Sequence, residues 1–184
     1  NWSRSICSTL YWIRRKALNE AARRMGATKL ATAHNLDDET QTALLNIVHG
    51  DVERMLRPPS VAKKTRSMFI PRIKPLAEIP ERETALYAYA SGTRFQTVPC
   101  PHGHDALRGD IRVMLNRLEL KHPGAKHTIY RSMERLSDGF HVKGRTRAFQ
   151  ACAVCGEPTP NTRCEACKML TTLRIPADAM SVAG

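Results

Sequence analysis

The stretch from Lys29 to Thr42 constrains the fold of this chain more than any other part of its sequence. Its apolar run, Leu30 to Ala33, predicts a short strand, and Asp37 and Asp38 suit the first turn of a helix that follows. In an open α/β sheet, ligands bind where a strand ends and the next helix begins. Adjacent carboxylates there would suit a metal-bound nucleotide or an oriented water. The alternative is a capped turn whose acids are solvated.

Apolar spacing predicts further helices and short strands along the chain. Helices are expected over 9–25, from the turn that carries Asp37 and Asp38 (the acidic turn) to Gly50, and over 80–90, 106–120 and 126–136. Strands are expected at 67–71 and 95–98. The order of helix, strand and helix favours an α/β fold in which helices flank a partial parallel sheet. No apolar run approaches the ~18 residues that would span a membrane.

Four of the six cysteines form two C-x-x-C pairs near the end of the sequence: Cys152, Cys155, Cys164 and Cys167. Two such pairs can place four thiolates tetrahedrally around Zn²⁺. The segment is too short for a core of its own, so the metal would supply its folding energy and would be structural. An iron centre and two disulfides are the alternatives. This cysteine pattern favours a metal site in a reducing compartment, with the cytoplasm as the default location.

Basic residues outnumber acidic ones, 29 against 17, which gives a formal charge of +12. Such a balance favours a polyanionic partner, most simply nucleic acid, although a basic surface without a binding role is the alternative. The segment Arg54 to Lys74 carries no acidic residue, and a second basic stretch precedes the paired cysteines. The residues expected to contact a nucleic-acid backbone are Arg54, Arg57, Lys63, Lys64, Arg66, Arg145 and Arg147.

The two remaining cysteines, Cys7 and Cys100, have features that favour reactivity. Cys7 precedes two adjacent arginines on a predicted helix, and cations nearby favour the thiolate form. Cys100 lies between two prolines and close to His102 and His104. A rigid loop that holds a cysteine beside a histidine would suit a nucleophile or a metal ligand. The alternatives are buried apolar cysteines and solvated loop histidines.

Several segments, in order along the chain, carry a resemblance to one family. They are Cys7 with Arg14 and Arg15, then ATAHNLDDETQTALLNIVHGD, PRIKPLAEIPERETALYAYASG, CPHGHDALRGDIRVMLNRLELKHPG and CAVCGEPTPNTRCEACKML. Together they resemble the tRNA 2-thiouridine synthetases of the PP-loop ATP pyrophosphatase superfamily. The resemblance covers nearly the whole chain. It implies an adenine nucleotide α-hydrolase-like domain that ends in a zinc ribbon.

The resemblance implies an ATP-dependent tRNA sulfurtransferase. ATP would adenylate the C2 carbonyl oxygen of a tRNA uridine, and sulfur from a carrier protein or another donor would then displace AMP. By position, the residues beside ATP and Mg²⁺ would be His34, Asn35, Asp37 and Asp38, with Asp38 acting at the metal or the reacting centre. Cys7 and Cys100 would be catalytic cysteines.

The sequence departs from the family pattern at two places. The family implies a [4Fe–4S] cluster on three cysteines, but Leu10 stands where the second cysteine of the first pair would fall. Leucine cannot ligate iron, so a cluster would have to be held by Cys7 and Cys100 with His102 or His104 as a substitute ligand. A persulfide relay between Cys7 and Cys100 is the alternative. The phosphate-binding loop Ser-Gly-Gly-x-Asp-Ser is absent from the sequence, so this chain alone is expected to bind ATP poorly.

The domain organisation follows from these assignments. Residues 1–140 are expected to form the C-terminal part of a PP-loop ATPase-like domain, 141–150 a basic connector, 151–175 the zinc ribbon and 176–184 a tail. The expected partners are tRNA, a sulfur donor, and either a second copy or another chain that supplies the N-terminal part. The alternative function is a catalytically inactive zinc-ribbon module that binds tRNA or scaffolds a thiolation complex.

Overall fold

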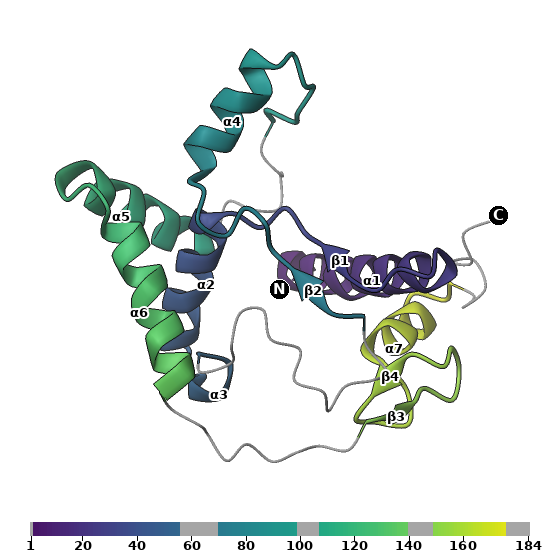
Figure 1. Cartoon of the computed structure of the whole chain (residues 1–184). Coiled ribbons are helices and arrows are strands. Elements are labelled where there is room, and N and C mark those ends of the chain that lie inside the picture. Colours follow the sequence, from purple (N-terminus) through teal and green to yellow (C-terminus); the bar gives the residue numbers. More distant parts are fainter. Residues whose placement is uncertain (1, 56–69, 99–106, 140–148, 176–184) are drawn as a thin grey trace. The chain divides into compact units, whose positions relative to one another are not determined.

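The structure is a computed structural model that describes residues 2–55, 70–98, 107–139 and 149–175 (Figure 1). In the first helix, side chains are described from Leu10 onward. The helices are α1 (Trp2–Arg24), α2 (Leu36–Val48), α3 (Val52–Met55), α4 (Glu81–Ala90), α5 (Leu107–Lys121), α6 (Ala125–Gly139) and α7 (Glu165–Thr172). The strands are β1 (Leu30–Ala31), β2 (Arg72–Ile73), β3 (Gln150–Ala151) and β4 (Pro158–Thr159). None of the helices in these ranges has the length and apolarity that a membrane crossing requires.

Strands β1 and β2 pair in parallel. The Leu30 N–H donates to the Pro71 carbonyl at 2.8 Å, and the Thr32 N–H donates to the Ile73 carbonyl at 2.9 Å. Both partners advance by two residues in the same direction, which is the pattern of a parallel ladder. The predicted α/β class with a partial parallel sheet is therefore confirmed.

The described residues fall into two compact units. The first takes its described residues from Asn1–Leu30, Ala62–Arg72 and Arg145–Gly184, and the second takes them from Ala31–Val61 and Ile73–Gly144. The predicted boundaries at residues 140 and 150 stay a prediction.

The core of the second unit lies where α2, α5 and α6 pack together (Figure 1). Leu36 at the start of α2 and Leu115 in the middle of α5 are almost fully buried. Ile111 and Tyr130 add apolar area from α5 and α6. Burial of these side chains holds the three helices together, because removing each from water stabilises the fold by roughly 1.5–3 kcal/mol. The first turn of α2 is thereby fixed.

The core of the first unit is built around cysteines. Helix α7 packs on α1, and β3 pairs antiparallel with β4 to form a hairpin. The cysteines Cys152, Cys164 and Cys167 are buried together with Ala166, and the ring of Trp12 from α1 packs against them.

Two of the predicted strands differ from the structure. The strand predicted at 95–98 is wrong, because these residues are irregular and the side chains of Phe95 and Val98 are exposed. Of the strand predicted at 67–71, residues 67–69 lie outside the described ranges. The observed strand β2 begins at Arg72, directly after the predicted strand ends. Pro71 lacks the N–H that a strand interior needs, and it offers only its carbonyl to the ladder.

Candidate active site and metal centre

The turn between β1 and α2 is held by a reciprocal cap. The Asp38 N–H donates to Asn35 Oδ1 at 3.0 Å, and the Asn35 N–H donates to Asp38 Oδ2 at 3.2 Å. This capping box satisfies two N–H groups that the first turn of a helix leaves free. Asn35 and Asp38 are therefore fixed in position by local sequence alone.

Asp37 is buried, with 4 % of its surface exposed. Its Oδ1 accepts from the ammonium of Lys126 on α6, and its Oδ2 accepts the backbone N–H of Glu81 at 2.7 Å. The same ammonium donates to Asn116 Oδ1 on α5 at 2.7 Å. Asp37 thus joins the start of α2 to the start of α4 and, through Lys126, to α5 and α6. Both of its carboxylate oxygens have a partner within the chain.

Asp38 lies on the accessible side of the same turn, and its side chain is 38 % exposed. Its Oδ1 lies 3.5 Å from Nη1 of Arg108, at the start of α5. The Arg108 guanidinium also donates to Gln41 Oε1 at 3.2 Å and to Thr42 Oγ1 at 2.9 Å. A cation is thereby held beside a carboxylate that still reaches solvent.

The neighbouring polar residues differ in how strongly they are engaged. The carboxylate of Glu39 accepts from the Lys74 ammonium at 2.6 and 2.7 Å and is nearly buried. The ring of His34 is exposed, and its Nδ1 lies 2.9 Å from Thr32 Oγ1. Asp38 and His34 are therefore the ionisable side chains of this turn that a ligand can reach.

Some predicted site residues cannot be placed against this turn. Cys7 lies within α1, in the part whose side chains the structure does not describe. Of the predicted RNA contacts, Arg54 on α3 is described, and its guanidinium is largely exposed and pairs with Asp51 at 3.2 Å. Outside the described ranges are Cys100, His102, His104, Arg57, Lys63, Lys64, Arg66, Arg145 and Arg147.

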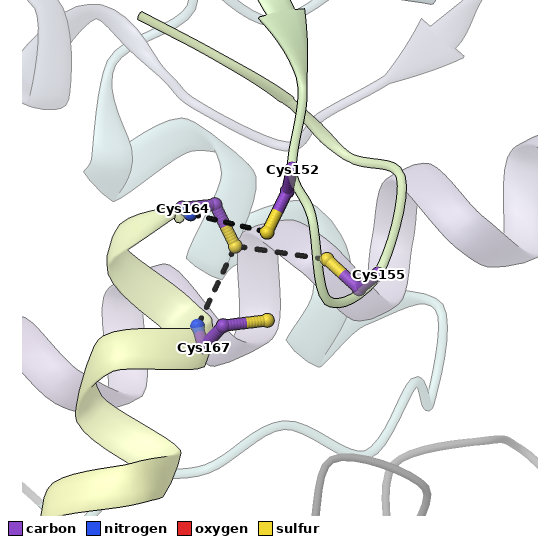
Figure 2. A group of neighbouring side chains, drawn as sticks. All are labelled: Cys152, Cys155, Cys164 and Cys167. Carbon is purple, nitrogen blue, oxygen red and sulfur yellow. Dashed lines mark hydrogen bonds between the residues drawn. The ribbon is translucent and has the colours of Figure 1, made fainter. Parts of the chain in front are cut away.

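The four cysteines of the paired C-x-x-C motifs come together in space (Figure 2). Their sulfur atoms all lie within 4.8 Å of one another, and Sγ of Cys155 is 3.7 Å from Sγ of Cys164. A disulfide would bring two sulfurs to ~2.05 Å, so none joins these cysteines. A tetrahedron with metal–sulfur bonds of ~2.3 Å has edges of ~3.8 Å. The spacing of the sulfurs therefore fits one four-coordinate metal ion.

The local backbone aims these sulfurs inward. The β3–β4 hairpin carries the first pair, and Gly156 takes a φ of +71°, a conformation that residues with a side chain rarely adopt. Cys164 caps α7, and its sulfur accepts the Cys167 N–H at 3.4 Å. The Cys152 sulfur accepts the Cys164 N–H at 3.3 Å (Figure 2). Helix α7 was not predicted, because cysteine is outside the usual set of capping residues.

The thiols of the cluster have shifted pKa values. Burial raises the pKa of Cys152, but the backbone N–H groups of Cys164, Val154 and Cys155 outweigh burial and lower it to about 6. Burial raises the pKa of Cys167, and the adjacent sulfurs of Cys155 and Cys164 raise it further. Cys152 thus favours the thiolate form, whereas Cys167 resists a further negative charge in the cluster. A cation at the centre would relieve that repulsion.

Sequence reasoning missed Lys126 and Arg108, the cations that lie beside Asp37 and Asp38. Asp37 and Lys126 are 89 positions apart, and Arg108 is 67 positions from Gln41. No local pattern links residues at such separations, so only the tertiary fold shows these contacts.

The chain is similar to proteins of tRNA thiolation. No family model matches the chain. It is 35 % identical, over 92 % of its length and 56 % of the relative, to a protein of Haloferax volcanii named tRNA 2-thiolation protein NcsA. It is 32 % identical, over 90 % of its length and 53 % of the relative, to the tRNA-5-methyluridine(54) 2-sulfurtransferase of Pyrococcus horikoshii.

A solved structure of a tRNA thiolase is also similar to this chain. The chain superposes with a TM-score of 0.70, at 34 % identity, on the U34-tRNA thiolase NcsA from Methanococcus maripaludis with its [4Fe-4S] cluster. The match covers 91 % of this chain and 53 % of that one. The chain spans about half the length of the curated relatives named above. By sequence and by fold, it is similar to tRNA 2-thiolation proteins over the part of their length that it spans.

Proposed function

We propose that the protein containing this chain is a tRNA uridine 2-sulfurtransferase that uses ATP and Mg²⁺. The observation that carries the proposal is the agreement in sequence and in fold, over about nine-tenths of the chain, with proteins named for tRNA 2-thiolation. Relatives from mouse and cattle are named cytoplasmic tRNA 2-thiolation protein 1, which supports a cytoplasmic location. The paired substrates are tRNA and a sulfur donor.

The chemistry proceeds in two steps. The C2 carbonyl oxygen of the uridine attacks the α-phosphorus of ATP, and pyrophosphate leaves. A nucleophilic sulfur then attacks C2, the carbon–oxygen bond breaks, and the oxygen departs with AMP. Adenylation is needed because an oxide is a poor leaving group, whereas AMP is a good one. The protein has to hold the nucleotide, orient the uridine and deliver sulfur to the same carbon.

The two aspartates of the acidic turn have different roles in this proposal. Asp38 is accessible and lies beside the Arg108 cation, so it is the residue that would meet the nucleotide or its metal ion. Asp37 has both oxygens engaged by the fold and would hold the turn in place from behind. His34 and Asn35 lie within the same turn and would line the nucleotide. The Ser-Gly-Gly-x-Asp-Ser phosphate loop is absent from this sequence, so we assign no phosphate cradle to these residues.

Sulfur handling is assigned to Cys7 and Cys100. The similar thiolase structure is described with a [4Fe-4S] cluster. In this chain Leu10 on α1 stands where the resemblance implies a third cysteine, and its side chain is 59 % exposed and carries no ligand atom. The described residues therefore do not complete that ligand set, and no step of this proposal passes through iron.

The four clustered cysteines are assigned to structural zinc. Four thiolates at tetrahedral spacing are a donor set typical of Zn²⁺, and protein fills every coordination position. A closed site of this kind supplies folding energy and no catalysis.

Binding of tRNA is assigned to the basic residues of the chain. Its formal charge of +12 favours contact with phosphates, and the described Arg54 keeps 70 % of its side chain exposed. We place Arg57, Lys63, Lys64, Arg66, Arg145 and Arg147 in the same role. Affinity carried by such contacts falls steeply as salt is added.

Two variants of the intact protein separate the two chemical steps. With tRNA, ATP, Mg²⁺, a persulfide sulfur donor and a thiol reductant, Asp38→Asn is expected to slow both pyrophosphate release and 2-thiouridine formation by about 100-fold or more, because it removes a charge at the reacting centre. Cys100→Ser is expected to keep pyrophosphate release and to lose 2-thiouridine. Pyrophosphate is measured by coupled assay and the nucleoside by mass spectrometry.

The control for this pair is Asp110→Asn, which removes an exposed acid from the first turn of α5. It should behave as the wild type in both assays. Unchanged thiolation by Cys100→Ser would remove Cys100 from the mechanism. A wild-type protein that binds tRNA but releases no pyrophosphate would instead favour the non-enzymatic tRNA-binding module.

A further inference from the structure

A buried carboxylate joins the cysteine hairpin to helix α1. Glu157 follows the first cysteine pair, and its side chain is 10 % exposed. Its Oε1 accepts from Asn19 Nδ2 at 2.8 Å, and its Oε2 pairs with Nη1 of Arg23 at 2.9 Å. Both partners lie on α1, one turn apart. Hydrogen bonds to a charged group are among the stronger polar contacts in proteins, and here they fix one face of α1 to the hairpin.

The same residue is fixed to a cysteine ligand by its backbone. The Cys152 N–H donates to the Glu157 carbonyl at 2.9 Å, and the Gly156 N–H donates to the Cys152 carbonyl at 2.9 Å. The position of Glu157 therefore depends on the turn that places the Cys152 and Cys155 sulfurs. A change in that turn would move the Glu157 carboxylate directly.

Two further contacts continue the link along α1. Asn19 Oδ1 accepts from Arg72 Nη2 at 3.2 Å, which extends the link to strand β2. Nearer the N-terminus, the Trp12 ring packs against the cysteine cluster, and the Arg15 guanidinium lies 5.6 Å from the centre of that ring. Helix α1 thus makes two contacts near the cysteines: Trp12 packs against the cluster, and Asn19 binds Glu157.

We propose that Glu157 is a positioning residue that couples metal occupancy of the four-cysteine site to the order of helix α1. With the metal bound, the hairpin turn is fixed and the Glu157 carboxylate holds Asn19 and Arg23. Without it, the turn loosens and α1 loses that support. Cys7 lies on the same helix, so the metal would act at a distance on the segment assigned to sulfur handling. This inference rests on the proposed metal centre and adds a role to it.

The test is hydrogen exchange of α1 in the full chain, followed by mass spectrometry, with and without added Co²⁺ or Zn²⁺. In the wild type, the metal is expected to slow amide exchange in α1 by about tenfold or more. In Glu157→Gln, Co²⁺ should still give the absorption bands of thiolate coordination, while the slowing in α1 is lost. The matched control is Glu165→Gln, which removes an acid that pairs with Lys168 within α7.

Each outcome bears on the inference. Equal protection of α1 in Glu157→Gln and in the wild type would overturn it, and so would a wild type that shows the Co²⁺ bands without protection of α1. Absence of the bands in the wild type would overturn the metal centre and this inference with it. If Glu157→Gln loses the bands through misfolding, Asn19→Ala cuts the same link from the helix side, and retained protection in that variant counts against the coupling.

Discussion

Replacing Lys126 with methionine is expected to lower the free energy of unfolding by about 3–5 kcal/mol, because it leaves the Asp37 carboxylate buried without its ion partner. Both side chains of this pair are nearly buried, with 8 % and 5 % exposed. The loss would be a large part of the 5–15 kcal/mol that typical domains possess. Denaturation of the full chain by urea, followed by circular dichroism, measures it.

The control for Lys126 is Lys121→Met, an exposed position at the end of α5, which should change stability by less than about 0.5 kcal/mol. The double variant Asp37→Asn with Lys126→Met leaves no buried charge, and it should recover more than half of the loss. Asparagine keeps an oxygen for the Glu81 N–H. If Lys126→Met alone is as stable as the wild type, the pair does not hold the acidic turn.

Replacing Cys167 with serine is expected to abolish tight metal binding and to unfold the β3–β4 hairpin and α7. The Cys167 side chain is almost fully buried in the cluster. The hydroxyl oxygen of serine is a poor substitute for a thiolate as a metal ligand. Binding of structural zinc supplies about 10–16 kcal/mol in small zinc domains, so most of the folding energy of the hairpin would be lost. Metal content of protein purified under reducing conditions, together with thermal melting, measures the effect.

Cys100→Ser is the control for the metal centre, because Cys100 belongs to neither C-x-x-C pair. It should keep its full zinc content. Zinc bound equally by Cys167→Ser and the wild type, or no zinc in the wild type, would contradict the assignment of the four cysteines.

Local sequence predicts the parts of the fold that depend on neighbouring residues. The cap at Asn35 needs only an acceptor side chain and an acid three positions later, both within one helical turn. The paired C-x-x-C spacing predicts the cysteine cluster for the same reason, since each pair can offer two sulfur ligands to a shared ion from a single turn. Sites of this kind can be found in a sequence without knowledge of the tertiary fold.

Contacts between distant segments set the limit of such reasoning. Asp37 and Asp38 are adjacent and chemically identical, yet one is buried against Lys126 and the other reaches solvent. Their difference comes from α6, which the sequence places far away. The error at 95–98 has the same origin, because a strand requires a partner and apolar spacing alone does not supply one. Glu157, which meets Asn19 across 138 positions, was likewise beyond prediction.

The most direct test of the proposed chemistry follows the C2 oxygen of the modified uridine. The intact protein is given tRNA that carries ¹⁸O at C2 of its uridines, with unlabelled ATP, Mg²⁺, a persulfide sulfur donor and a thiol reductant. Adenylation followed by displacement predicts that each 2-thiouridine formed is matched by one AMP that carries a single ¹⁸O, as seen by mass spectrometry. Thiolated tRNA accompanied by unlabelled AMP, or no thiolated tRNA at all, would contradict the account.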